Sequence, residues 1–345
     1  MNLPTFKERL RDKDRQKFFV TFLAGKMLGI VLAAGLVAAV GPWLFAKVVH
    51  AAAPGVTDPP IGDVVNATNT AWTIIAAFLV FFMQAGFMML EAGFARTREV
   101  VNVLVECIVD TCLCALLFWA FGFAFMFGVG NGFIGHQFFF LNGAEATYTF
   151  GGTFDTGVAF MAFFLFQFAF ADTASTITSG AMVGRTDFKG DLAYSVAVSG
   201  FIYPILGHWV WGPDGWLALM GSKGNFFASL GVPFRDFAGS TVVHSLGGWI
   251  SLAMCLVIGP RTGRFVAGTP PMTGHNLPMS TLGALLLWFG WFGFNGGSTL
   301  AMTNAVPLIL LNTNLAAAAG GVTALLTAWY YERIPSVGQV INGVI

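Results

Sequence analysis

Long apolar segments that carry almost no charge constrain the fold of this chain most. Seven follow one another, at residues 70–94, 101–126, 157–184, 190–211, 238–259, 276–298 and 304–331. A helix of about 20 apolar residues crosses a hydrocarbon layer about 30 Å thick. Their length and the lack of period-two alternation favour helices over the strands of a barrel. The sequence therefore predicts an all-α, polytopic membrane helical bundle.

Composition supports this prediction and excludes several classes of protein. Only 10% of the 345 residues are charged, against roughly 25% in soluble domains. The formal net charge is zero, so nothing indicates a nucleic-acid partner. No metal-ligand cluster, nucleophile motif or phosphate-binding loop is recognisable, and the glycine-rich "GVGNGFIG" at 128–135 is interpreted as an outer turn. We therefore expect neither an enzyme nor a bound metal or cofactor.

The cysteines give no sign of a disulfide framework. All four lie within apolar segments and are interpreted as small core residues: Cys107, Cys112, Cys114 and Cys255.

A further hydrophobic segment, at about residues 18–49, precedes the bundle. The basic stretch before it predicts a cytoplasmic N-terminus and comprises Lys7, Arg9, Arg11, Lys13, Arg15 and Lys17. The segment ends at "VVHAAAP", so a cleaved signal peptide and a retained anchor helix both remain open. We predict that 1–53 is this N-terminal region, 54–67 a linker and 68–345 the membrane domain.

Positive charges predict the orientation of the seven segments. They mark alternate loops, at Arg96 and Arg98, Arg185 and Lys189, Arg261 and Arg264, and Arg333. The intervening loop at 128–156 has no Lys or Arg. The first core helix is therefore expected to enter from the outside of a multi-pass protein in the inner (plasma) membrane.

One apolar segment contains two ionisable residues, in "DFAGSTVVHSLGGWISLAMC" at 236–255. Asp236 opens the predicted helix, which favours an N-cap and does not exclude a place in a pore. His244 follows eight residues later, about 12 Å along a helix axis, which would place both on one broad face. It is either a structural histidine bonded to a neighbouring helix or a residue of a transport pathway, since ionisable groups at this depth often mark one.

Aromatic residues supply the other candidates. Phe166 and Phe170 are spaced i, i+4, as are Phe294 and Ser298. With 37 phenylalanines in the chain, this spacing alone does not separate a functional pair from core or lipid-facing residues. Trp211, at the outer end of its segment, fits an interfacial aromatic belt or a site that attracts cations.

Six motifs remove part of this ambiguity. In chain order they are "MQAGFMMLEAGF", "FLFQFAFADTASTITSGAMVGRTDF", "YPILGHWVWGPDGWL", "DFAGSTVVHSLGG", "HNLPMSTLGALLLWFGWFGFNGGS" and "NTNLAAAAGG". Together they resemble the bacterial ammonium transporter (Amt) family of the Amt/Rh superfamily, from about residue 68 to the C-terminus. The resemblance implies an eleven-helix inverted-repeat protomer, represented here by about seven core helices and the N-terminal segment. It also implies a homotrimer in which each protomer has its own pore.

The resemblance also implies roles for individual residues. Trp211, Ser298 and Phe166 match the outer ammonium-recruiting site. Phe170 and Phe294 match the stacked rings of the pore gate. For the pore itself, Asp236 matches a buried supporting carboxylate and His244 the first of two histidines that deprotonate ammonium or bind ammonia.

The implied function is nitrogen uptake. Ammonium, or its analogue methylammonium, is recruited by the aromatic site, deprotonated and passed through a hydrophobic pore across the bilayer. A cytoplasmic nitrogen-regulatory signal protein is a candidate partner. The alternative is an ammonium sensor on the same scaffold, which binds without conducting and signals to a cytoplasmic output module.

Three departures from the family pattern limit these expectations. The chain ends at "PSVGQVINGVI", where the resemblance implies four more helices and a second pore histidine, so this 345-residue form alone is not expected to transport. Asp172 stands where a small neutral residue is expected, which would add a carboxylate near the pore. Gly184 stands where the family usually has a glutamate before the arginine.

Overall fold

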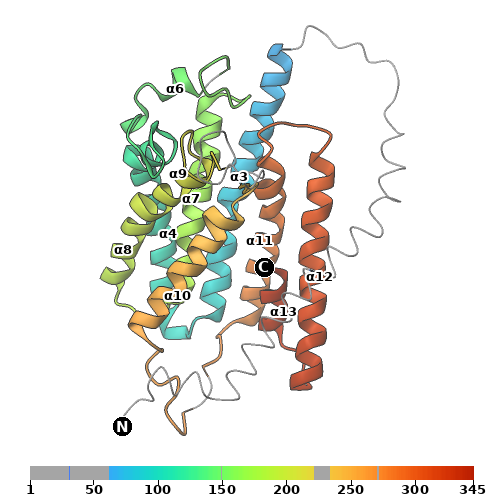
Figure 1. Cartoon of the computed structure of the whole chain (residues 1–345). Coiled ribbons are helices and arrows are strands. Elements are labelled where there is room, and N and C mark those ends of the chain that lie inside the picture. The colour runs from blue at the N-terminus through green and yellow to red at the C-terminus, as the bar shows by residue number, and fades with distance from the viewer. Residues whose placement is uncertain (1–30, 32–61, 149, 221–233, 270–271) are drawn as a thin grey trace, which may run out of the picture. The chain divides into compact units, whose positions relative to one another are not determined.

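The computed structural model describes residue 31 and residues 62–148, 150–220, 234–269 and 272–345 (Figure 1). The predicted signal peptide or anchor therefore lies, apart from Val31, outside the described residues. The described chain is mainly helical and forms two compact units, one of residues 60–307 and one that includes 308–345.

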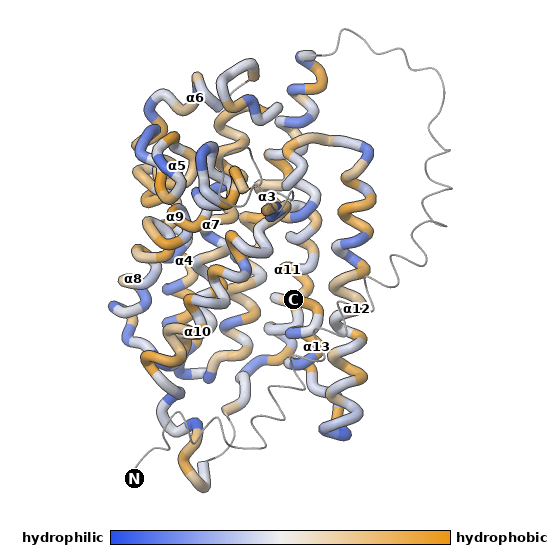
Figure 2. The backbone as a smooth tube through the Cα atoms, in the orientation of Figure 1, coloured by the Kyte–Doolittle hydropathy of each residue, from blue (hydrophilic) through white to orange (hydrophobic). Residues whose placement is uncertain are grey.

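Among the residues that the structure describes, six helical segments are long and apolar enough to cross a membrane. They are α3 (Gly62–Phe94), the continuous run of α4 (Val100–Leu117) and α5 (Phe123–Phe127), α7 (Phe160–Met182), α10 (Leu246–Ile258) with the π-helical turn before it, α11 (Leu277–Gly297) and α12 (Val306–Glu332). Figure 2 shows hydrophobic residues along the lengths of α10 and α12. The predicted all-α membrane bundle is confirmed.

The predicted segment at 190–211 is helical too. It comprises α8 (Phe188–Ala197), a π-helical stretch at 198–202 and α9 (Tyr203–Trp211). Its first turn carries Lys189 and Asp191, which makes it less apolar than the other six. One boundary differs clearly, because α3 begins at Gly62 and so includes the end of the stretch predicted as a linker.

Short elements connect α5 to α7. Strands β1 (Gly130–Asn131) and β2 (Ile134–Gly135) pair as an antiparallel hairpin, which confirms a turn within 128–135. A 3-10 turn (Phe139–Leu141) and α6 (Ala144–Thr147) follow.

His208 of α9 fixes this hairpin to the bundle. Its Nδ1 lies 2.9 Å from the carbonyl oxygen of Met126, and its Nε2 lies 2.7 Å from that of Asn131. Both partners are carbonyl oxygens, which accept hydrogen bonds. A carboxylate oxygen of Asp214 lies 3.2 Å from Nε2 of His208, and the other accepts from the amide of Gly130 at 2.9 Å.

Helices α3 and α11 pack closely through glycines. A Cβ at Gly283 would lie 2.4 Å from the amide nitrogen of Leu90, and one at Gly293 would lie 2.5 Å from Cβ of Leu79. Residues without side chains let the two backbones approach, as is common between membrane helices. This contact holds the end of α11 that carries Phe294 and Ser298.

The smaller unit contains most of α12 together with α13 (Val337–Val344). These two helices also meet at glycines, because a Cβ at Gly320 would lie 2.0 Å from the carbonyl oxygen of Gly343.

The cysteines are all free, as predicted, but they are not all in the core. Cys107 and Cys114 are buried, Cys255 is partly buried and Cys112 is exposed on α4. The prediction for Cys112 is wrong because residues 107 and 114 are two helical turns apart and share a face, whereas 112 lies on another side of the helix.

Candidate functional site

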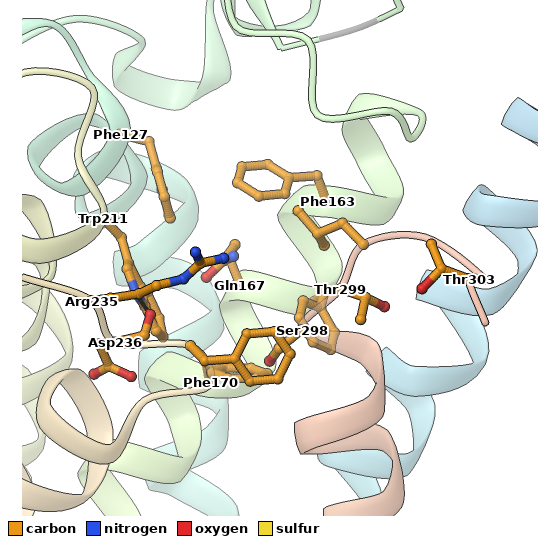
Figure 3. Close-up of a pocket in the computed structure, with 13 residues that line it drawn as sticks. Phe127, Phe163, Gln167, Phe170, Trp211, Arg235, Asp236, Ser298, Thr299 and Thr303 are labelled. Carbon is orange, nitrogen blue, oxygen red and sulfur yellow. Dashed lines mark hydrogen bonds between the residues drawn. The ribbon is translucent and has the colours of Figure 1, made fainter. Parts of the chain in front are cut away.

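A pocket of about 520 Å³ opens between α7, α9, the segment before α10 and the end of α11 (Figure 3). Its walls are mainly aromatic, and the residues that line it are Phe127, Phe163, Phe166, Gln167, Phe170, Trp211, Arg235, Asp236, Phe237, Ser298, Thr299, Leu300 and Thr303. All three residues that the sequence analysis assigned to the recruiting site are therefore brought together here: Trp211, Ser298 and Phe166.

A stacked pair of phenylalanine rings adjoins the pocket, and Phe170 of this pair lines it. The rings of Phe170 and Phe294 lie nearly parallel, with centroids 4.0 Å apart and an interplanar angle of 23°. Phe166 packs on Phe170 at 4.6 Å. His244 does not line the pocket, although its ring lies 5.5 Å from that of Phe294. The tertiary structure therefore places the pocket, the stacked rings and the histidine next to one another.

Trp211 is held in a fixed orientation. Its indole nitrogen donates to the backbone carbonyl of Asp236 at 2.9 Å, and its ring lies 6.0 Å from Phe170. Because the N–H group is already bonded, the part of Trp211 that faces the pocket is its π-system.

Asp236 caps the helix through its side chain, although Gly239, not Asp236 as the sequence predicted, is the N-cap residue. Its two carboxylate oxygens accept from the backbone amides of Gly239, Ser240, Thr241 and Val242, at 2.6–3.1 Å. Four N–H donors stabilise the ionised carboxylate, which leaves it little capacity to bind a ligand directly.

The predicted shared helical face of Asp236 and His244 is wrong. Gly239 has φ +100°, and regular helix begins only at Ser240, as a π-helical stretch that continues to Ser245. Asp236 thus precedes the helix and His244 lies in its first turns. π-Helical turns often occur at functional sites because they shift side chains out of the α-helical register.

Two oxygen atoms of the pocket remain able to accept hydrogen bonds. The hydroxyl of Ser298 donates to the carbonyl of Phe294 at 2.7 Å, so its own lone pairs stay available. The side-chain oxygen of Gln167 is buried and accepts no hydrogen bond from the described residues. Sequence analysis did not identify Gln167, although a lone amide within "FLFQFAF" was a usable signal. It also missed Arg235, Thr299 and Thr303, whose place depends on loops.

The two unusual residues of the sequence lie elsewhere. Asp172 is completely buried but does not line the pocket. Gly184 has φ +67°, and a Cβ there would lie 2.5 Å from the Glu99 carboxylate. Glu99 in turn is bonded to Arg96, so a carboxylate from another loop occupies this space.

The structure also brings together three potential metal-ligating residues that sequence analysis did not identify. Potential ligand atoms of Glu91, Glu106 and Cys107 come within 4.8 Å of one another. They belong to α3 and α4 and lie outside the aromatic pocket.

Comparisons with known proteins identify the family of the chain. Residues 71–345 match the model of the Ammonium Transporter Family. The chain is 45% identical over 280 residues to ammonium transporter Amt2 of Archaeoglobus fulgidus, an alignment that covers 79% of this chain and 57% of that protein. The chain thus spans little more than half the length of this relative.

Solved structures show the same fold. The chain aligns with a Sensor Amt Protein at a TM-score of 0.73 and 38% identity, covering 82% of this chain and 67% of the other. It aligns with Mep2 of Candida albicans at a TM-score of 0.69 and 28% identity, covering 81% of this chain and 58% of the other. The family match extends over most of the sequence, and the chain therefore belongs to the ammonium transporter family.

Proposed function

We propose that the protein is an ammonium channel or transporter that recruits ammonium in the aromatic pocket, deprotonates it and passes it across the membrane. The observation that carries this proposal is the stacked pair Phe170 and Phe294, which lies between the pocket and His244. A relative that is 45% identical to this chain is named an ammonium transporter, which supports ammonium as the substrate.

The pocket has the groups that a small cation with four hydrogen-bond donors requires. The face of Trp211 attracts a cation, and Ser298 and Gln167 offer acceptor oxygens. Phe166 contributes a further aromatic wall. An alkali cation of similar size gains the attraction of the ring but donates no hydrogen bonds, which supports selectivity for ammonium.

The stacked rings oppose the passage of charge. Ammonium has a pKa near that of a lysine amine, about 10, and burial lowers such a pKa by up to about 3–5 units. Loss of a proton at the rings therefore costs less than transfer of the whole cation through them. An imidazole beside these rings can accept a hydrogen bond from ammonia or relay the released proton. We assign this role to His244, whose ring lies next to that of Phe294. Asp236 fixes the backbone at the start of the helix that carries His244 and contributes a negative field.

A sensor is the second candidate. One structure that resembles this chain, at 38% identity, is titled Sensor Amt Protein. A sensor would use the same pocket, bind ammonium without net transport and pass the occupancy of the site to an output module. The resemblance further supports a homotrimer in the plasma membrane and an interaction with a cytoplasmic nitrogen-regulatory protein.

Replacement of Trp211 by leucine tests the recruiting site. Loss of a partly desolvated cation–π contact should weaken methylammonium binding by about 1–2 kcal/mol, or roughly 5- to 30-fold. The matched control is Trp249→Leu, since Trp249 is 70% exposed on α10 and does not line the pocket. Binding and uptake are measured on the full-length protein in detergent and in proteoliposomes.

The outcomes separate the two candidates. Uptake that falls together with binding in the Trp211 variant supports transport. Binding that falls in that variant, in a wild-type protein that shows no uptake, supports the sensor. Unchanged binding in the Trp211 variant would remove the recruiting role of this residue.

A further inference from the structure

A second polar site is buried between α3, α4, α7 and α8, away from the aromatic pocket. Its centre is the Glu–Glu–Cys cluster, which we define as Glu91, Glu106 and Cys107. Their potential ligand atoms all lie within 4.8 Å of one another, and the three residues are only 8%, 4% and 2% exposed. Buried carboxyl groups are costly unless they are paired, so the arrangement requires an explanation.

Neighbouring hydroxyl groups satisfy only part of the cluster. Ser179 Oγ lies 2.6 Å from both carboxylate oxygens of Glu91, but it has one hydrogen to donate. The hydroxyl of Tyr194 donates to one oxygen of Glu106, and the thiol of Cys107 donates to the other at 3.6 Å, so three hydrogens serve four carboxylate oxygens. The oxygen acceptors therefore outnumber the hydrogens that these neighbours supply.

The surroundings add to this excess. Asp110, one helical turn after Glu106, accepts from Ser175 at 2.6 Å. Asp172 is fully buried, and neither of its carboxylate oxygens has a hydrogen-bond partner in the described part of the chain. Within the same residues, no Lys, Arg or His pairs with any of these carboxyl groups. The region lacks positive charge.

We propose that Glu91, Glu106 and Cys107 bind a divalent transition-metal cation of the zinc class. A thiolate beside carboxylates favours Zn²⁺ or Co²⁺ over Mg²⁺ or Ca²⁺, which prefer oxygen ligands alone. Bonds to Zn²⁺ are about 2.0–2.3 Å long, so ligand atoms around one ion lie roughly 3–4 Å apart, and rotation of the glutamate side chains closes the remaining gap.

The hydroxyl groups then act as a supporting layer. Ser179 and Tyr194 hold the two glutamates in place, as second-layer donors do in metal sites. The metal ion would join α3 to α4 directly and reach α7 and α8 through these hydroxyls. Binding replaces protons: the Cys107 thiol and any protonated glutamate each lose one as they become ligands.

A further carboxylate lies near the cluster. Asp191, in the first turn of α8, is buried and accepts from the side chains of Asn102, at 3.2 Å, and Thr186.

Cobalt provides the direct test. The full-length protein in nanodiscs is stripped with a chelator and titrated with Co²⁺ alone. We expect one Co²⁺ per protomer and a thiolate-to-cobalt charge-transfer band, both reversed by Zn²⁺. Cys107→Ser should abolish the band and weaken binding at least tenfold, whereas Cys114→Ser, at a buried thiol of the same helix, should retain both. This result does not depend on whether the protein transports ammonium.

Glu106→Gln separates metal binding from folding. The substitution keeps the shape and removes one acceptor, so the metal-free variant should melt no lower than the wild type but should lose the Co²⁺-induced rise in melting temperature. Absence of stoichiometric Co²⁺ binding to folded wild-type protein would overturn the proposal. So would a charge-transfer band that persists in Cys107→Ser, because the ion would then be bound elsewhere.

Discussion

At the scale of single residues, the left-handed backbone of Gly184 leaves space that the side chain of Glu99 occupies. The residue has φ +67°, and the space beside it holds the Glu99 carboxylate, which is bonded to Arg96. The family pattern has a glutamate at this place in the sequence. Here the negative charge comes from a different loop, and the glycine makes room for it.

Substitution of Gly184 tests this interpretation. Gly184→Ala introduces a Cβ at a left-handed φ and within 2.5 Å of Glu99, so it should destabilise the protein by about 1–3 kcal/mol. Gly180→Ala is the control, because Gly180 lies within α7 with no atom within 4 Å of an added Cβ and should be neutral or stabilising by up to about 1 kcal/mol. Thermal unfolding in detergent measures both. Equal melting temperatures for the two variants would contradict the role of Gly184.

At the scale of elements, the glycine contacts between α3 and α11 position one wall of the pocket. Gly283→Ala should destabilise the helix pair by about 1–3 kcal/mol, since its Cβ would lie 2.4 Å from a backbone nitrogen that cannot move alone. Gly248→Ala in α10, where an added Cβ meets nothing within 4 Å, provides the matched control. Protease susceptibility and thermal unfolding report the difference. If Gly283→Ala behaves like Gly248→Ala, the close approach of α3 and α11 is not required.

At the scale of the whole molecule, the predicted orientation depends on the charged loops. Seven crossings after an outer start would place residue 333 in the cytoplasm. An Arg333→Cys variant should therefore resist an impermeant thiol reagent added outside intact cells and react after permeabilisation. The experiment uses a Cys112→Ser background, because Cys112 is exposed on α4. Rapid labelling from outside would show that the orientation is inverted.

The sequence by itself determined the fold class and most helix positions. Runs of apolar residues have to satisfy their backbone hydrogen bonds within the membrane, so length and composition are enough to predict helices. The predicted segments at 276–298 and 238–259 agree within two residues with the helical segments Leu277–Gly297 and Ser240–Ile258. For the site, the motifs identified Phe170, Phe294 and Trp211, but spacing alone did not separate them from the many other aromatic residues.

Only the tertiary structure decided which side chains meet. Phe170 and Phe294 are 124 positions apart and stack because α7 and α11 both pack on α3. The cap geometry of Asp236 follows from the left-handed Gly239, which helical periodicity does not reveal. Glu91 and Cys107 come together because the chain reverses between α3 and α4. Periodicity describes the faces of one helix at a time, whereas a binding site depends on how several helices approach one another.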